Sequence, residues 1–457
     1  MERSRAAAVG AATPAIPLYL GFSRAEVKVS LSDRYAGTEI GPAATPAWTT
    51  RTLTGIGDSF GAFRHRNFRI FFVGHLLSLS GTWLQITALG WLVLELTNSE
   101  FWLGVVNAGT SVPILFFSLY AGVIADRVDK RWILIAAQAV MFFQALTLAV
   151  LTHLEVITIG WILALVLVLG VANAFEIPTR QSFFVELVGQ QDLTNAIALN
   201  SSAFNATRMV GPAIAGGLIG AFGIAACFYG NAISYFFVIA GLMAIRRPSP
   251  EPAPRTLSTL ENIREGFAWI WNERVPRLVV VFVATASVLV FPFTMLLPVF
   301  ARDLLRIGPQ GLGWLYSATG AGALIAGLTV TAISQRVPRG RLLVASGAAM
   351  SVFVAAFALT PSFLLSLLFL AATGFAMILS TATANSLLQS LVPNHLRGRV
   401  MSVYVVMFLG VTPFGYLLAG SLAGIFGARA TLAAGAGILF TILLTQFWRS
   451  PRLREAV

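Results

Sequence analysis

Arg208 is the residue of this sequence whose chemistry most needs an explanation. It lies about ten residues into a long apolar run, and an unpaired charge in apolar surroundings is costly. Two interpretations are open. The first is a structural ion pair, with Glu176 as the nearest plausible carboxylate and Asp126 as the second. The second is an anchor for an anionic small molecule.

Other polar side chains inside the apolar runs recur at helical spacing. The first set begins at His75 with steps of 3, 4 and 3, and the second begins at Ser201 with steps of 4, 3 and 4, so each set lies on one helix face. We expect these faces either to line a path between helices or to make helix–helix hydrogen bonds. The candidate path residues are His75, Ser78, Thr82, Gln85, Asn173, Asn205 and Arg208.

Three titratable groups in these runs are candidates for reversible proton binding: Glu176, Glu95 and His75. Histidine titrates near pH 6.5, which suits a switch, and His75 is the sole histidine inside a run. A buried histidine that only satisfies a hydrogen bond is the alternative. Glu95 lies near one end of its run, where an interface position is the alternative.

The remaining reactive residues do not assemble an enzyme site. Cys227 is the single cysteine and the four histidines are scattered, so we expect no disulfide and no metal site. The sequence shows no nucleophile–base pair. Glycines such as Gly320 and Gly322 lie within apolar runs and do not form a nucleotide-binding loop. We therefore expect no catalytic residue and no cofactor.

The elements that position these residues are long apolar helices. The chain is 57% hydrophobic and 11% charged over 457 residues, whereas soluble domains carry about 25% charged residues. Runs of about 20 residues match the length needed to cross a bilayer as helix. The sequence therefore predicts an all-α polytopic membrane protein with twelve transmembrane helices, near residues 68–95, 102–124, 132–152, 156–177, 197–221, 226–245, 277–300, 310–334, 341–359, 362–386, 399–424 and 429–448.

The basic residues predict the orientation of these helices. If the N-terminus is cytoplasmic, 27 of the 31 lysines and arginines lie in cytoplasmic segments and three, Arg302, Arg306 and Arg429, lie outside. This asymmetry follows the positive-inside rule, so both termini are predicted to be cytoplasmic. It also explains the net charge of +12 without a nucleic-acid partner.

The composition divides the chain into five parts. We expect residues 1–62 to be a disordered cytoplasmic tail, 63–245 and 277–449 to be two six-helix halves, and 450–457 to be a short cytoplasmic tail. The linker, 246–276, contains closely spaced prolines followed by apolar residues at helical spacing. It is predicted to carry an amphipathic helix along the cytoplasmic interface. The alternative is a helix packed on the bundle.

The two halves are related in sequence. A shift of 209 residues places Asp126-Arg127-Val128 on Gln335-Arg336-Val337 and Lys130 on Arg339, and a shift of 204 aligns four glycines from Gly211 and Gly415 onward. Parallel repeats of this kind place a substrate path at the interface between the halves.

The segment from Gly122 to Arg131, Gly-Val-Ile-Ala-Asp-Arg-Val-Asp-Lys-Arg, resembles the signature loop of the major facilitator superfamily. The resemblance implies a gating loop made by Gly122, Asp126, Arg127, Lys130 and Arg131. It implies that Asp126 faces the start of span eleven near Arg399–Ser402 and that the first span of each three-helix unit lines the path. Asp129 stands where the family has glycine. In the equivalent loop of the second half, Gln335 stands at the position of Asp126, so the acidic residue is missing there.

A second element, Gly211, Pro212, Gly216 and Gly217, resembles the span-five motif of exporters in this superfamily, with one extra residue after Pro212. Close helix packing is the alternative. The stretches Pro178-Thr179-Arg180-Gln181 and Arg397-Gly398-Arg399-Val400 resemble the enterobactin-exporter-type branch, which includes multidrug efflux antiporters. The resemblance implies a monomeric inner-membrane protein that exports a small amphipathic molecule in exchange for protons; an importer or facilitator is the alternative.

Overall fold

The computed structural model describes residues 56–125, 128–245 and 259–455. All regular structure in these ranges is helical. The helices are η1 (Ile56–Arg64), α1 (Arg66–Thr97), α2 (Glu100–Ala125), α3 (Lys130–His153), α4 (Ile159–Phe222), α5 (Ile224–Ala244), α6 (Thr259–Asn272), α7 (Arg274–Leu289), α8 (Phe293–Val299), η2 (Phe300–Leu304), α9 (Gly308–Ser334), α10 (Arg339–Leu359), α11 (Phe363–Leu391), α12 (Arg397–Val405), η3 (Val406–Gly410), α13 (Thr412–Phe426), α14 (Ala428–Arg449) and α15 (Pro451–Glu455).

The apolar runs of the sequence fall on this helical structure. Ten helical segments of the described part are long and apolar enough to cross a membrane. One of them, α4, is 64 residues long and covers most of the predicted run 156–177 and all of the run 197–221. Helix α9, with 27 residues, is not one of these ten, but it coincides with the predicted run 310–334. The two runs of α4 belong to two helical stretches that meet at Gly189, where the backbone is not helical and φ is +71°.

The ends of the predicted segments needed one correction. We expected a disordered tail up to residue 62, but Ile56–Arg64 forms η1. Ala62 is fully buried there, and its N–H donates to Asn195 Oδ1 at 3.0 Å. Residues 1–55 lie outside the described part, as does most of the proline-rich segment of the linker. The amphipathic helix of the linker corresponds to α6.

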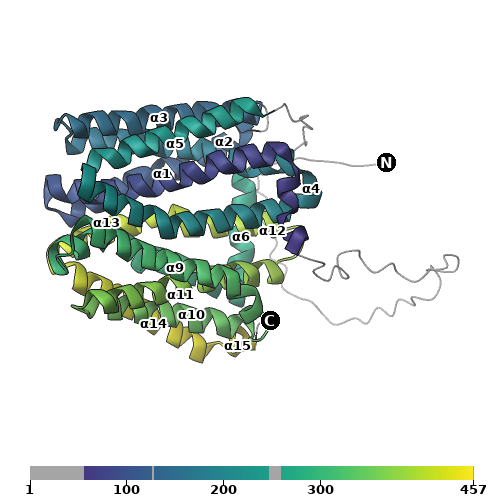
Figure 1. Ribbon diagram of the computed structural model, residues 1–457. Helices are drawn as coiled ribbons and strands as arrows, with labels where there is room; N and C mark the ends of the chain where they lie inside the picture. The colour runs from purple at the N-terminus through teal and green to yellow at the C-terminus, as the bar shows by residue number, and fades with distance from the viewer. Residues whose placement is uncertain (1–55, 126–127, 246–258, 456–457) are drawn as a thin grey trace, which may run out of the picture. The chain divides into compact units, whose positions relative to one another are not determined.

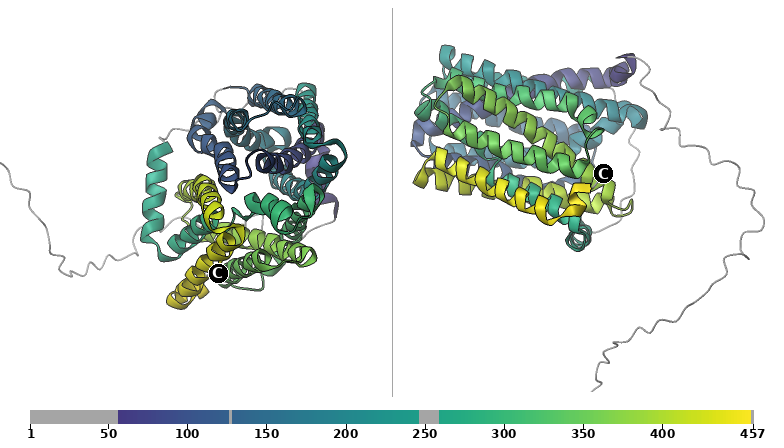
Figure 2. Two further views of the ribbon diagram at one scale, coloured as in Figure 1. Left: turned by 90° about the vertical axis from the view of Figure 1, so that its left-hand side faces the viewer. Right: turned by 90° about the horizontal axis from the view of Figure 1, so that it is seen from below.

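The helices gather into two groups that follow the order of the chain. In Figure 1, α1 to α5 lie in one group, α9, α10, α11 and α14 lie in the other, and α6 crosses the same end as the C-terminus. Figure 2 shows the same division along the helix axes. Helix α4 packs along α9, and α2 packs along α13, so these two pairs join the halves.

Matching turns in the two halves support the internal repeat. Gly223 ends α4 with a φ of +81°, and Gly427 ends α13 with a φ of +84°. These are equivalent positions under the 204-residue shift. A positive φ costs glycine little because it has no Cβ, which explains why both halves keep glycine at this turn.

Two membrane helices of the second half are broken where their counterparts in the first half are continuous. One consists of α7, α8 and the π-helical turn η2, and the other consists of α12, the π-helical turn η3 and α13. Such turns interrupt the regular ladder of hydrogen bonds and often accompany functional sites. Both broken helices contact the first half, through α1 and α2.

Candidate functional site between the two halves

Arg208 lies near the middle of the predicted run 197–221, on the side of α4 that meets the other half. Its guanidinium carbon is 5.8 Å from the centre of the Trp83 ring. Its ionisable neighbours are Tyr316 of α9 and Tyr416 of α13. Among the described residues, no carboxylate forms an ion pair with it. The arginine therefore lies over one aromatic ring of the first half and has two tyrosines of the second half as ionisable neighbours.

The predicted partner of Arg208 is engaged elsewhere. Glu176 Oε1 accepts from Arg180 Nε at 2.7 Å, four residues along α4. This pair is buried, with 8% of the Glu176 side chain and 16% of the Arg180 side chain exposed. The structure therefore contradicts the Glu176–Arg208 pairing. Asp126, the second predicted partner, lies outside the described residues.

A network of amide side chains joins α1, α3 and α5 inside the first half. Asn231 donates to Gln85 Oε1 at 2.8 Å, and Gln85 donates to Gln144 Oε1 at 3.3 Å. Ser234 donates to Asn231 Oδ1 at 3.2 Å, and Tyr235 Oη lies 3.4 Å from Asn231 Nδ2. All five side chains are buried. Gln85 thus makes the helix–helix hydrogen bonds that were the alternative to lining a path.

His75 lies near the Glu176–Arg180 pair. Its ring is stacked on Phe71 with centroids 5.5 Å apart, and it is 5% exposed. Arg180 and Asn200 are its charged and hydrogen-bonding neighbours, yet Nε2 is buried without a partner. His75 thus lies between the Phe71 ring and the Glu176–Arg180 pair.

The other predicted polar residues have more local roles. The Thr82 hydroxyl donates to the Ser78 carbonyl at 2.9 Å, and Asn205 donates to the Ser201 carbonyl at 2.9 Å. Asn173 is half-buried, and Ser78 is buried. Glu95 is exposed and accepts from Trp91 Nε1 at 2.5 Å, an environment that favours an interface role over proton coupling.

The span-five element packs closely at three of its four positions. A Cβ added to Gly211 would lie 2.7 Å from Trp83 Cβ, and one added to Gly216 would lie 2.7 Å from the Pro309 carbonyl oxygen. Pro212 contributes its carbonyl to a close approach by Gly313 of α9. Gly217 is exposed and has nothing within 4 Å. The element thus brings α4 against α1 and against the opposite half.

Contacts between the halves are dense at the end where α4 finishes and α9 begins. Arg302 donates to the Leu94 carbonyl at 2.5 Å and to Asn98 Oδ1 at 2.9 Å. Gly104 of α2 and Gly420 of α13 approach so closely that a Cβ on Gly420 would lie 3.1 Å from Gly104 Cα. These contacts hold this end of the bundle closed.

The predicted gating loop is described only in part. Gly122 lies in α2, whereas Asp126 and Arg127 lie outside the described residues. Lys130 pairs with Glu186 of α4 at 2.5 Å, and Arg131 donates to the Met243 carbonyl at 2.8 Å. The expected contact of Asp126 with the start of span eleven is therefore not described. Arg399 at that position pairs with Glu265 of α6.

Sequence reasoning missed several residues of this site. Trp83, Tyr316 and Tyr416 are aromatic residues in apolar helices, where they give no signal that distinguishes them from core residues. Gln144 and Asn231 are polar and within apolar runs, so their cost in a membrane could have marked them. The Glu176–Arg180 spacing of four residues was also readable as a helix ion pair.

Comparison with known proteins identifies the family. Residues 57–456 match the family described as transmembrane secretion effector. The chain belongs to this family of major facilitator superfamily transporters. This transporter is 26% identical to the multidrug efflux pump Tap of Mycolicibacterium fortuitum, over 82% of this chain and 93% of that protein. It is 26% identical to the staphyloferrin A transporter of Staphylococcus aureus (80% and 91% covered). It is 24% identical to the enterobactin exporter EntS of Shigella flexneri (84% and 93% covered).

Solved structures show the same fold. The nucleoside transporter NupG (D323A mutant) superposes with a TM-score of 0.71 at 14% identity, covering 84% of this chain and 99% of that chain. A bacterial homologue of the lysosomal transporter Spinster gives a TM-score of 0.69 at 12% identity, covering 85% and 97%. The family match and the curated relatives show that the chain is a multi-pass membrane transporter of small molecules, and not an enzyme.

Proposed function

We propose that this transporter is a proton-driven exporter of small amphipathic molecules that bear an anionic or strongly hydrogen-bond-accepting group. In this proposal twelve helices span the cell inner membrane, both termini are cytoplasmic, and the protein acts as a monomer. The cargo alternately meets the two sides of the membrane as the halves rock against each other. The efflux pump Tap and the exporter EntS among its relatives support the outward direction.

The location of Arg208 is the observation that carries this proposal. An arginine at the centre of a membrane helix costs roughly 2.5–3.5 kcal/mol on insertion scales. Its guanidinium lies over the Trp83 ring, its ionisable neighbours Tyr316 and Tyr416 belong to the second half, and no carboxylate among the described residues pairs with it. A cation over an aromatic ring is stabilised by roughly 0.5–2 kcal/mol. This contact leaves the hydrogen-bonding capacity of the Arg208 guanidinium unused. An anionic group can take up that capacity while the rings contact the apolar part of the same molecule.

The Glu176–Arg180 pair is the proton-coupling element in this proposal. Protonation of Glu176 would remove one charge from a buried ion pair, and breaking such a pair is costly. Arg180 would then need another neighbour, and His75, which also contacts Asn200, lies near it. Coupling therefore depends on a rearrangement within the first half, close to α4, which also carries Arg208.

The contacts between the halves support alternating access. In the proposed orientation, the Arg302 hydrogen bonds to Leu94 and Asn98 lie at the outer end of the bundle. The close approach of Gly104 to Gly420 lies at the same end. Opening to the outside would have to break these contacts. They are consistent with a transporter that is closed on its outer side.

The test of the proposed cargo chemistry is a transport assay in inverted membrane vesicles from a pump-deficient host. Uptake of an anionic amphipathic dye would be compared with that of a neutral dye of similar size, for Arg208→Gln and Arg208→Lys. We expect Arg208→Gln to reduce uptake of the anionic dye at least tenfold. Arg208→Lys should retain more uptake of this dye than Arg208→Gln does. Equal uptake of both dyes by Arg208→Gln and by the unchanged protein would refute the role of Arg208.

The test of direction and coupling uses proteoliposomes with imposed pH gradients. An exporter coupled to protons should move the dye against its gradient only when protons flow the other way. Glu176→Gln should abolish this response while leaving exchange of dye across the membrane. Dye movement that ignores the pH gradient in the unchanged protein would instead favour the alternative, an importer or facilitator.

A further inference from the structure

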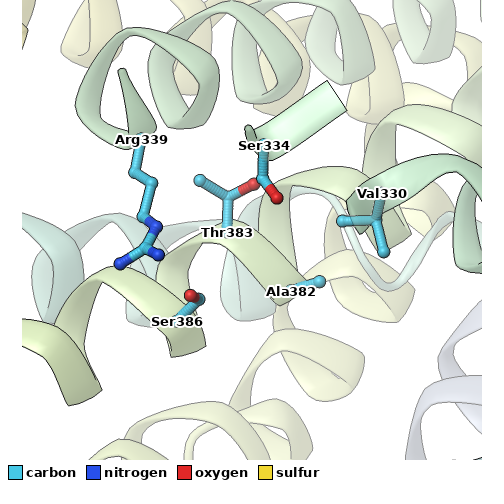
Figure 3. A pocket seen from close by; sticks show the side chains of 6 residues that line it. All are labelled: Val330, Ser334, Arg339, Ala382, Thr383 and Ser386. Carbon is cyan, nitrogen blue, oxygen red and sulfur yellow. The ribbon is translucent and has the colours of Figure 1, made fainter. Parts of the chain in front are cut away.

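A cavity with both polar and apolar lining lies at one end of the second half, between α9, α10 and α11. Its volume is about 180 Å³, several times the ~30 Å³ that one water occupies in the liquid. It is lined by Val330, Ser334, Arg339, Ala382, Thr383 and Ser386. In Figure 3 the Arg339 guanidinium extends toward Ser386, and Thr383 lies between Arg339 and Ser334.

The internal repeat shows what this cavity lacks. In the first half, Lys130 at the start of α3 is neutralised by Glu186. The equivalent of Lys130 under the 209-residue shift is Arg339, and the equivalent of Glu186 under the 204-residue shift is Ser390. Within the described ranges Arg339 has no carboxylate partner. The second half thus keeps the cation and replaces the acid with a hydroxyl.

The groups facing the cavity are suited to an oxyanion. Arg339 supplies a permanent positive charge, and Ser386 supplies a hydroxyl group. Thr383 is 2% exposed, and its Oγ1 is buried without a hydrogen-bond partner, which normally costs free energy. Helix α10 begins at Arg339, so its unpaired N–H groups add positive potential at this end. The lining contains no carboxylate, which disfavours a cation.

We propose that this cavity binds a phosphate group, held by the Arg339 guanidinium with Thr383 and Ser386. A phosphate has enough acceptor oxygens to satisfy an arginine and several hydroxyls at once. The bound group takes the place of the missing acid and ties the ends of α10 and α11 together. Both inorganic phosphate and the headgroup of an anionic phospholipid carry this chemistry. The site is separate from Arg208 and does not depend on the direction of transport.

The experiment uses the full chain in phosphatidylcholine nanodiscs in phosphate-free buffer. In the first arm, inorganic phosphate is titrated while the thermal unfolding midpoint is followed. In the second arm, phosphatidylglycerol is added to the discs, and lipid retained by the protein is counted by native mass spectrometry. The variants are Arg339→Gln and Thr383→Val. The matched control is Arg336→Gln, which removes one exposed arginine from the same loop.

We expect at least one arm to show saturable binding. Arg339→Gln should weaken that binding at least tenfold, and Thr383→Val should weaken it about threefold, because a neutral hydrogen bond is worth less than a charged one. Arg336→Gln should leave binding unchanged. Phosphate binding alone identifies a soluble ligand, and lipid retention alone identifies a headgroup.

Two results would overturn the proposal. One is the absence of binding in both arms. The other is equal weakening by Arg336→Gln and Arg339→Gln, which would indicate only a diffuse surface charge. If Arg339→Gln does not fold, the comparison of Thr383→Val with Arg336→Gln still tests whether the cavity binds phosphate, because valine preserves the shape of threonine.

Discussion

The two halves of this transporter share a helix order but are held together by different chemistry. In the first half, side chains bond across helices, as in the Gln85–Gln144 and Asn231–Gln85 amide pairs. In the second half, buried hydroxyls such as those of Ser346 and Ser351 donate to carbonyls of their own helix. The described part of the second half shows no buried amide pair between helices.

This difference suggests that the first half is the more rigid one and that the second half contains the helices that bend. Polar bonds between helices fix their mutual positions, and the titratable groups Glu176, Arg180 and His75 lie among them in the first half. The second half contains the two interrupted membrane helices, with π-helical turns at Phe300–Leu304 and Val406–Gly410. A repeat can therefore diverge so that one copy holds the charge chemistry and the other provides helices that bend.

The largest effect is expected when the first half loses one member of its buried ion pair. Ser380 and Ala384 occupy the positions equivalent to Glu176 and Arg180. Glu176→Ser leaves the Arg180 charge buried and unpaired, so the protein should lose about 3 kcal/mol of stability. Equilibrium unfolding of purified protein in detergent measures the loss.

The double variant Glu176→Ser/Arg180→Ala copies the second half and sharpens this comparison. It removes both charges, so most of the lost stability should return while proton-coupled transport stays abolished. A double variant as unstable as Glu176→Ser would contradict the view that the cost comes from an unpaired charge.

The next effect concerns the close backbone packing of the second half. A Cβ on Gly322 would overlap the Ala371 carbonyl oxygen, between α9 and α11, whereas Gly437 has nothing within 4 Å. Gly322→Ala should therefore cost about 1–3 kcal/mol by overpacking, and Gly437→Ala should be close to neutral. The unfolding midpoint in a denaturant series separates the two, and equal midpoints would rule out this packing argument.

A smaller effect is expected from the amide network of the first half. Asn231→Ala removes the hydrogen bond to Gln85 and the one from Ser234. Hydrogen bonds inside membranes are worth about 0.6 kcal/mol on average, so the loss should be roughly 1 kcal/mol. Ser351→Ala, which removes only a bond to its own helix, is the matched variant in the second half and should cost less. If Ser351→Ala were the more damaging change, the contrast between the halves would fail.

The sequence predicted the fold well because a membrane helix can be recognised from the apolar composition of a single run of residues. The apolar runs follow from residues near one another, and the repeat follows from overlaying the chain on itself at shifts of 204 and 209 residues. The ring contact of Arg208 with Trp83 could not be predicted, since it joins positions 125 residues apart and aromatic residues are ordinary in such helices. The Glu176–Arg180 pair was visible from its spacing, but the cost of burying Arg208 favoured a different partner for Glu176.

The smallest effect tests the residue at which the signature loop departs from its family. Asp129 caps α3 by accepting from the Arg131 N–H at 2.9 Å, whereas Pro338 at the equivalent position offers no such acceptor. Replacing an aspartate cap by alanine costs about 1 kcal/mol, and replacing it by glycine costs only a few tenths. Asp129→Ala should therefore lower stability measurably, while Asp129→Gly, which restores the residue usual in the family, should be nearly neutral. Hydrogen exchange at the first turn of α3 distinguishes the two variants. Equal protection in both would mean that the aspartate does not stabilise this turn and that the loop keeps it for another reason, such as its charge.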